Sequence, residues 1–219
     1  DADAKASPNP LLKHLRKLTD PTASVAQGTH SAFSDATNKL FELFLGAICV
    51  SFAGDVCLDD PDHSDGSNPD VLLTRKGKRW GLACKVPSGQ SSLTLYERIE
   101  EGVRQIDRSA AEAGFVVINM RNQIDHDAFW KMLAPGDAQR GDPPTWSMWP
   151  SIDQPTDLLL SMCHSKLRSL IIDNGDNAIR ALVEKSRTKP SVLFFAQTTL
   201  MVANHGKPGL TRLGLFRLW

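Results

Sequence analysis

The sequence predicts an α/β fold in which a mixed central β-sheet is flanked by helices. Three observations lead to this prediction. Apolar residues recur at helical spacing over residues 31–50, short β-type apolar runs begin at residue 70, and a second helical stretch separates these runs from an apolar strand at 115–119. A helix that links two strands favours their parallel placement, so we expect both parallel and antiparallel neighbours in the sheet.

The composition is that of one ordinary globular domain. The chain has 219 residues, of which 41% are hydrophobic and 23% are charged, enough for a single hydrophobic core. Lys and Arg number 25, as do Asp and Glu, so a nucleic-acid partner would have to meet a local basic patch. We expect one domain, 1–219, with a core at 31–119, a tail and short helix at 1–28, and a helical and hairpin extension at 120–219.

The cysteines and the absence of long apolar runs predict a cytoplasmic protein. The four cysteines form no C-x-x-C pair, and a domain of this size does not need disulfides, which favours a reducing compartment. A bond between Cys49 and Cys57 is left open. No apolar run reaches the roughly 18 residues of a membrane span, and residues 1–10 lack the regions of a signal peptide. We therefore expect no membrane contact.

Helices are expected before the first strands. Residues 10–19 place leucines at helical spacing among basic residues, which predicts a short amphipathic helix. Residues 31–50 carry a broad apolar stripe, typical of a long and mostly buried helix, with one acid, Glu42, near the stripe. The turn-forming sequence at 59–69 then separates this helix from the strands.

A β-hairpin is expected between residues 70 and 86. Its tight turn is Arg75-Lys76-Gly77-Lys78, which includes the glycine that such turns favour. Ser91 or Ser92 can cap the helix that follows. The short strand at 115–119 comes after this helix.

The remaining chain predicts helices and a closing hairpin. Residues 136–155 are rich in Pro and Gly and form a loop that either covers a site or is an exposed connector. Helices are expected at 156–172 and 174–185. The closing hairpin is expected from strands at 191–203 and 210–219.

The first hairpin gathers polar residues at one edge. Pairing residues symmetrically about the turn places Asp70 opposite Ala83 and brings Lys85 next to the entry of the first strand. Because side chains alternate between the faces of a strand, Asp70, Ala83 and Lys85 share one face. The apolar residues between them lie on the other face.

These residues resemble the signature of the PD-(D/E)XK phosphodiesterase superfamily, the restriction-endonuclease-like nucleases. Pro69-Asp70, a hairpin and Ala83-Cys84-Lys85 follow a helix that carries an acid at Glu42. The resemblance implies a restriction-endonuclease-like core that hydrolyses DNA phosphodiester bonds with Mg²⁺ or Mn²⁺. It further implies that Glu42, Asp70 and the carbonyl of Cys84 bind the metal, and that Lys85 is the catalytic cation. Oxygen ligands suit such a hard cation.

One position departs from this signature. Ala83 stands where the family has Asp, Glu or sometimes Gln, and alanine offers no ligand. Three explanations follow: a substitution that disables a nuclease, a ligand relocated to the next helix at Glu97, Glu101 or Gln105, or a natural pseudo-enzyme. If only a ligand is missing, glutamate at position 83 should switch on metal-dependent cleavage.

Basic residues at the hairpin turn are candidate phosphate contacts, although a solvated turn explains them equally well. They are Arg75, Lys76, Lys78 and Arg79. The expected function is metal-dependent cleavage of DNA, with this chain in a catalytically disabled form because of Ala83. The alternative is a non-catalytic nuclease-like domain that binds nucleic acid or a partner protein. Association into a homo-oligomer and the biological setting, such as restriction, phage defence or toxin activity, are left open.

Overall fold

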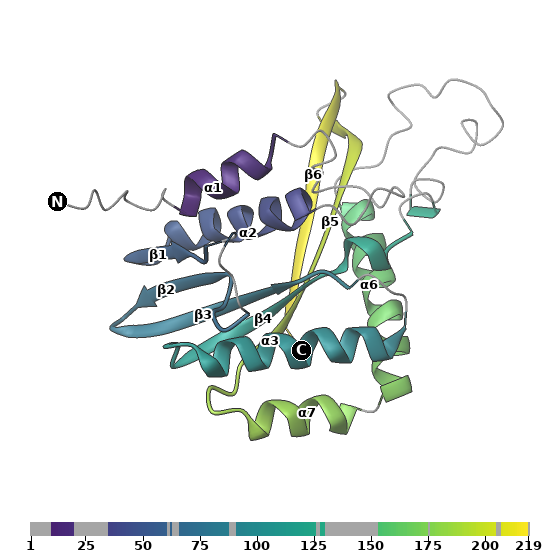
Figure 1. The fold of residues 1–219 in the computed structure, drawn as a ribbon. Helices are drawn as coiled ribbons and strands as arrows, with labels where there is room; N and C mark the ends of the chain where they lie inside the picture. The colour runs from purple at the N-terminus through teal and green to yellow at the C-terminus, as the bar shows by residue number, and fades with distance from the viewer. Residues whose placement is uncertain are drawn as a thin grey trace.

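A six-stranded mixed sheet forms the centre of the fold, with helices on both faces (Figure 1). The α/β prediction is therefore confirmed. The strands lie side by side in chain order, from β1 to β6. The structure, a computed structural model, describes residues 10–19, 35–60, 62, 66–87, 91–125, 128–129, 153–174, 176–204 and 207–218.

The elements follow the predicted order, with one strand more than expected. They are α1 (Pro10–Lys17), α2 (Asp35–Val50), β1 (Asp55–Leu58), β2 (Val71–Arg75), β3 (Lys78–Lys85), α3 (Ser92–Arg108), β4 (Ala113–Asn119), the 3₁₀ helix η1 (Met120–Gln123), α6 (Asp153–Asn174), α7 (Asp176–Lys185), β5 (Ser191–Asn204) and β6 (Lys207–Leu218). The unpredicted strand is β1. Residues 31–34 of the predicted long helix and 136–152 of the predicted loop lie outside the described residues.

The sheet combines both kinds of strand pairing. β3, β4 and β5 are parallel neighbours, whereas β1, β2 and β3 form an antiparallel meander and β6 pairs antiparallel with β5. The crossover helix α3 links β3 to β4, as the parallel arrangement requires. The segment after residue 119 thus adds two strands to the same sheet.

Local signals fix the β2–β3 hairpin and the start of α3. Lys76 and Gly77 have φ angles of 52° and 72°, the left-handed conformation that a two-residue hairpin turn needs at both positions. The pairing of Val71 with Leu82 confirms the predicted register. The side chain of Ser91 accepts a hydrogen bond from the backbone N–H of Thr94 and caps α3, also as predicted.

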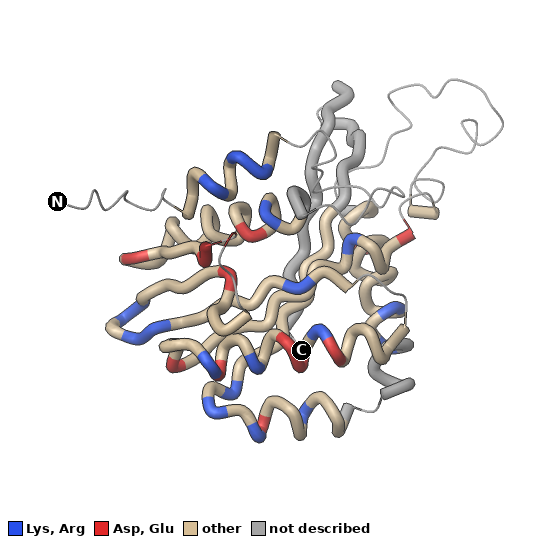
Figure 2. Tube along the Cα trace, viewed as in Figure 1, with Lys and Arg blue, Asp and Glu red and all other residues tan. Residues whose placement is uncertain are grey.

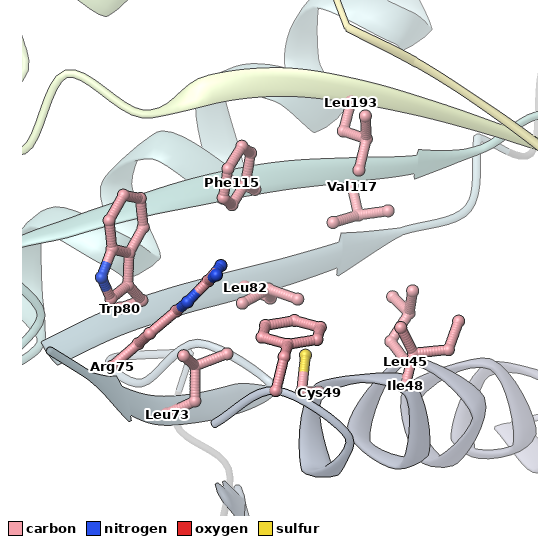
Figure 3. Close-up of a pocket in the computed structure, with 11 residues that line it drawn as sticks. Leu45, Ile48, Cys49, Leu73, Arg75, Trp80, Leu82, Phe115, Val117 and Leu193 are labelled. Atoms are coloured by element: carbon pink, nitrogen blue, oxygen red, sulfur yellow. The ribbon is translucent and has the colours of Figure 1, made fainter. Parts of the chain in front are cut away.

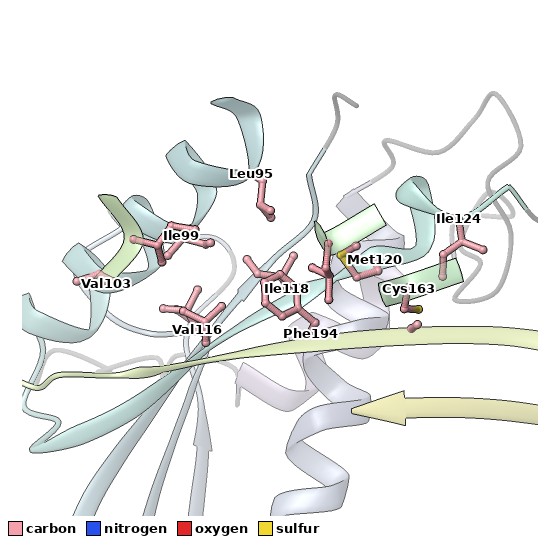
Figure 4. Packing of buried hydrophobic residues seen from close by; sticks show 14 of the residues in the cluster. Leu95, Ile99, Val103, Val116, Ile118, Met120, Ile124, Cys163 and Phe194 are labelled. Atoms are coloured by element: carbon pink, nitrogen blue, oxygen red, sulfur yellow. The ribbon is translucent and has the colours of Figure 1, made fainter. Parts of the chain in front are cut away.

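Two apolar clusters cover the two faces of the sheet. One lies between the sheet and helices α3, α6 and α7, and Figure 4 shows Ile99 of α3 and Val116 and Ile118 of β4 within it. The other lies between the sheet and α2, where Phe41 stacks on Phe195 with ring centroids 5.3 Å apart. Side chains of β2 and β3 point into both apolar clusters. Residues at the end of this hairpin therefore lie between the two layers of helices.

The helix α1 forms where predicted but buries its polar residues. Lys13 and His14 are buried, whereas Leu11, Leu12 and Leu15 are 45–50% exposed. The two buried basic residues contact acids outside α1: Lys13 pairs with Asp60, and His14 contacts Glu42. Within the described part of the chain, no helix is both long and apolar enough to cross a membrane.

The four cysteines, all in the described part of the chain, are free thiols. The bond between Cys49 and Cys57 that the sequence left open is therefore not formed. Cys49 is buried in α2, whereas Cys57 is exposed on β1.

Candidate active site

Asp70 occupies the point where β2 begins beside the end of β3. Its side chain is 9% exposed, and its Oδ2 accepts a hydrogen bond of 2.6 Å from the backbone N–H of Cys84. The paired residues of the two strands end at Val71 and Leu82, one step before this contact. Asp70 therefore lies just beyond the last paired residues of the hairpin and contacts β3 through its side chain.

Glu42 is buried on α2 and is held by two basic partners. Its carboxylate accepts hydrogen bonds from Lys39 Nζ at 2.8 Å and 2.9 Å, and it lies 2.8 Å from Nε2 of His14. Glu42 is 4% exposed and His14 is fully buried. The N-terminal helix α1 thus contributes directly to the surroundings of the candidate metal ligand.

The contact between His14 and Glu42 requires a proton between them. Nδ1 of His14 lies 2.9 Å from the carbonyl oxygen of Pro10, which only accepts, so Nδ1 carries a proton. In a neutral ring Nε2 would then be a bare acceptor facing a carboxylate oxygen. The 2.8 Å contact is favourable only if His14 is doubly protonated or Glu42 carries the proton.

Lys85 ends β3 and forms an ion pair with α3. Its side chain is 9% exposed, and its Nζ donates to Oε1 of Glu101 at 2.8 Å. Arg98 donates to the other carboxylate oxygen at 2.7 Å. Partial burial of Glu101 acts to raise its pKa, but the hydrogen bonds and charges of Lys85 and Arg98 outweigh burial and lower the pKa. Glu101 is therefore ionised at neutral pH.

The charge of Asp70 is influenced by both Glu42 and Lys85. Burial raises the pKa of Asp70 to about 7, and repulsion from Glu42 adds to this shift. The charges of Lys85 and Lys39 and the hydrogen bond from Cys84 act in the opposite direction. Near neutral pH, Asp70 is thus poised between its protonated and ionised forms.

The raised pKa predicts that Asp70→Asn stabilises the fold at alkaline pH. The unfolded side chain has a pKa near 3.8, so the native state binds the extra proton between there and about 7. The wild-type free energy of unfolding should fall as pH rises through this window. We expect Asp70→Asn to be more stable than wild type at pH 8 by about 2 kcal/mol or more, at ~1.4 kcal/mol per pKa unit, and urea unfolding at pH 5 and 8 measures the difference.

Asp107→Asn is a control for which we expect the opposite effect on stability at pH 8. Its carboxylate accepts hydrogen bonds from the side chains of Ser186 and Thr188. Burial acts to raise its pKa, but these hydrogen bonds prevail and lower it. Asp107→Asn should therefore lose stability at pH 8. The prediction is contradicted if the free energy of unfolding of the wild type, compared with that of Asp70→Asn, does not fall between pH 5 and pH 8. Such a result would mean that Asp70 does not ionise in a buried position.

Ala83 shares a face with Lys85, as predicted, but lies inside the apolar cluster beneath α3. It is fully buried. A Cβ placed on Gly102 of α3 would lie 3.4 Å from Cβ of Ala83 and 2.7 Å from a methyl group of Val116. The helix backbone therefore passes directly over position 83, and the small residues at 83 and 102 permit this approach.

The three positions proposed for a relocated ligand have different surroundings. Glu97 is exposed to solvent. Gln105 is 5% exposed, and its Oε1 has no hydrogen-bond partner among the described residues. Glu101 is the one of the three whose side chain contacts Lys85.

The basic residues of the hairpin turn lie away from Asp70. Arg75, Lys76, Lys78 and Arg79 are all exposed, and Figure 2 shows Lys and Arg positions in blue at the tip of the β2–β3 hairpin. The length of β2, five residues, separates this tip from Asp70, a distance of about 16 Å at ~3.3 Å per residue. The structure therefore does not bring the basic cluster together with the candidate metal ligands.

The candidate metal site offers two buried carboxylates. Among the described residues, no group of three or more His, Cys, Asp or Glu lies close enough to hold a metal by itself. Asp70 and Glu42 are nevertheless buried carboxylates that repel each other, and the carbonyl of Cys84 lies one residue before Lys85. Mg²⁺ is commonly held by one or two carboxylates together with substrate phosphates, so a metal bound here would draw its remaining ligands from substrate.

Sequence reasoning missed the two basic partners of Glu42. Lys39 precedes Glu42 by three residues on the same helix, a spacing that places two side chains side by side and could have identified the pair. His14 is 28 residues away and meets Glu42 through tertiary packing. No pattern in the sequence indicated that contact.

Comparison of the chain with protein-family models, curated proteins and solved structures gives no match. The function therefore has to be inferred from the site itself.

Proposed function

We propose that this chain is a metal-dependent nuclease that hydrolyses DNA phosphodiester bonds, and that Glu101 supplies the carboxylate that position 83 lacks. The observation that carries the proposal is the ion pair between Lys85 and Glu101 beside the buried Asp70 and Glu42. Ala83 lies beneath α3, where a longer side chain has little room. The site would thus use a carboxylate from α3 in place of one from β3.

Each residue has a distinct role in this proposal. Glu42, Asp70 and the Cys84 carbonyl would hold Mg²⁺ or Mn²⁺, which would polarise the phosphate and lower the pKa of the attacking water. Lys85 places its ammonium group where it offsets negative charge that develops on the phosphate. Glu101 would take the place of the carboxylate that position 83 lacks, and its ionised carboxylate also holds Lys85 at 2.8 Å.

A DNA partner also accounts for the basic hairpin tip. Lys76, Lys78 and Arg79 are exposed there. Their separation from Asp70 of about 16 Å corresponds to about five base pairs at ~3.4 Å of rise along the axis of a DNA duplex. The tip would therefore contact the backbone several nucleotides from the cleaved bond, which requires positive charge without base recognition.

Incubation with plasmid and linear DNA tests the proposal. We expect cleavage with Mg²⁺ or Mn²⁺, none with chelator, and none for Asp70→Asn in either condition. A chain that cuts neither DNA nor RNA with either metal would contradict nuclease function and favour the non-catalytic alternative. A gel shift then distinguishes the partner: retention of DNA that weakens steeply with salt indicates nucleic-acid binding, and no retention at low salt indicates a protein partner.

A further inference from the structure

An apolar cavity lies on the face of the sheet opposite Ala83, between α2 and strands β2 to β5. Its volume is about 280 Å³, near the lower end of the roughly 300–1,000 Å³ typical of small-molecule sites. Figure 3 shows Leu45 and Ile48 of α2 facing Phe115 and Val117 of β4 across the space, with Leu193 of β5 beside them.

Apart from Arg75, the residues that line the cavity are uncharged and largely aromatic or aliphatic. Trp80 and Phe115 stack with ring centroids 5.7 Å apart and form one wall. Cys49 faces the cavity as a neutral thiol, because burial raises its pKa to about 11. Among the residues that the structure describes, no Asp or Glu lines the cavity. Water gains few hydrogen bonds in such a space, so an apolar group would displace it favourably.

One cation lies across this apolar space. Figure 3 shows the side chain of Arg75 extending from its strand between Trp80 and Leu82. The guanidinium carbon lies 5.2 Å from the ring centroid of Phe52, which also lines the cavity. Within the described part of the chain, no carboxylate forms an ion pair with Arg75. Its hydrogen-bond donors are thus available to an anion.

A second cation adds to the positive charge at this end. The ammonium group of Lys78 lies 5.5 Å from the ring centroid of Trp80, the residue that separates the cavity from the hairpin tip. The cavity is therefore apolar along its length and positive at one end. That combination is complementary to a molecule with a hydrocarbon body and a single negative head group.

We propose that this cavity binds a small amphiphilic anion, a medium-chain carboxylic acid, with its hydrocarbon against Leu82 and Phe115 and its carboxylate on Arg75. A nucleobase fits poorly, since its several donors and acceptors would lose their hydrogen bonds to water against apolar walls. The inference does not depend on nuclease function, because none of the proposed metal ligands lines the cavity.

Calorimetric titration with decanoate, below the concentration at which it forms micelles, tests this proposal. We expect saturable binding of one decanoate per chain and at least about tenfold weaker binding of decylammonium, which has the same tail and the opposite charge. Arg75→Gln should weaken decanoate binding about tenfold, as expected for the loss of one charge-assisted contact worth ~1.4 kcal/mol or more. Arg79→Gln, a neighbouring exposed cation that does not line the cavity, should have no effect.

A second variant locates the bound tail. Leu193→Trp fills the cavity from β5 and should abolish decanoate binding, with thermal unfolding used to show that the variant is folded. If that variant does not fold, Leu193→Ala replaces it, and the enlarged cavity should favour a longer acid over decanoate. No saturable decanoate binding, equal binding of decylammonium, or equal losses from Arg75→Gln and Arg79→Gln would each overturn the proposal.

Discussion

Lys85→Met and Glu101→Gln should each lower the rate of metal-dependent DNA cleavage by a factor on the order of 100 to 1,000, the range for loss of one preorganised charge-stabilising group. Lys85 loses its ammonium group in the first variant. In the second, Lys85 keeps its charge but loses the 2.8 Å partner that orients it. Single-turnover cleavage with saturating Mg²⁺ measures both rates.

A conservative replacement at position 101 tests how Glu101 acts. Glu101→Asp keeps a carboxylate one methylene shorter, and we expect it to recover part of the rate lost in Glu101→Gln with KM unchanged. A purely structural role for Glu101 would give equal losses for both replacements, together with a lower unfolding temperature. Glu97→Gln, an exposed acid on the same helix, is the matched control and should retain wild-type activity.

Wild-type cleavage rates in Glu101→Gln would contradict the assignment of Glu101. Loss of activity in Glu97→Gln alone would place the relocated carboxylate one turn earlier on α3. Either result would change the role of Glu101 and not the nuclease function, which Asp70→Asn and chelator test independently.

The local parts of the fold could be predicted from the sequence. The turn at Lys76 and Gly77 fixes the register of the hairpin, and the register fixes which side chains share a face with Asp70. The α3 cap at Ser91 is equally local. β1 escaped prediction because it has only four residues and alternates between exposed and half-buried positions, which gives too short a pattern to detect.

The surroundings of the site depend on tertiary contacts that no local pattern contains. His14 meets Glu42 only because α1 packs against α2, with its leucines exposed. The depth of Ala83 depends on how closely α3 approaches the sheet, which Gly102 permits. A lone glycine in a helical pattern does not reveal which strand residue it faces.

The predicted basic cluster illustrates the same limit at the surface. Sequence proximity suggested that Arg75 acts with Lys76, Lys78 and Arg79 on a phosphate backbone. In the structure Arg75 extends over apolar surface and lies 5.2 Å from the Phe52 ring. Alternation along β2 directs this side chain to the α2 face, so the cluster divides between two surroundings.

Ala83→Glu should destabilise the fold by about 3 kcal/mol or more and should not increase cleavage. The new carboxylate would be buried beneath α3, next to the backbone of Gly102 and opposite Asp70. Burial and Glu42 already raise the pKa of Asp70 to about 7, so a third carboxylate adds repulsion that Lys85, paired with Glu101, does not offset. Unpaired burial of a charged group is among the most destabilising single changes.

Ala83→Gln separates the effect of size from the effect of charge, since glutamine has nearly the same volume as glutamate but carries no charge. We expect Ala83→Gln to lose less stability than Ala83→Glu at pH 8, and the two losses to converge at pH 4, where the glutamate is protonated. Urea unfolding with and without Mg²⁺ measures both variants. If Mg²⁺ restores the stability of Ala83→Glu and this variant cuts DNA faster than wild type, the missing carboxylate belongs at position 83 and Glu101 does not replace it.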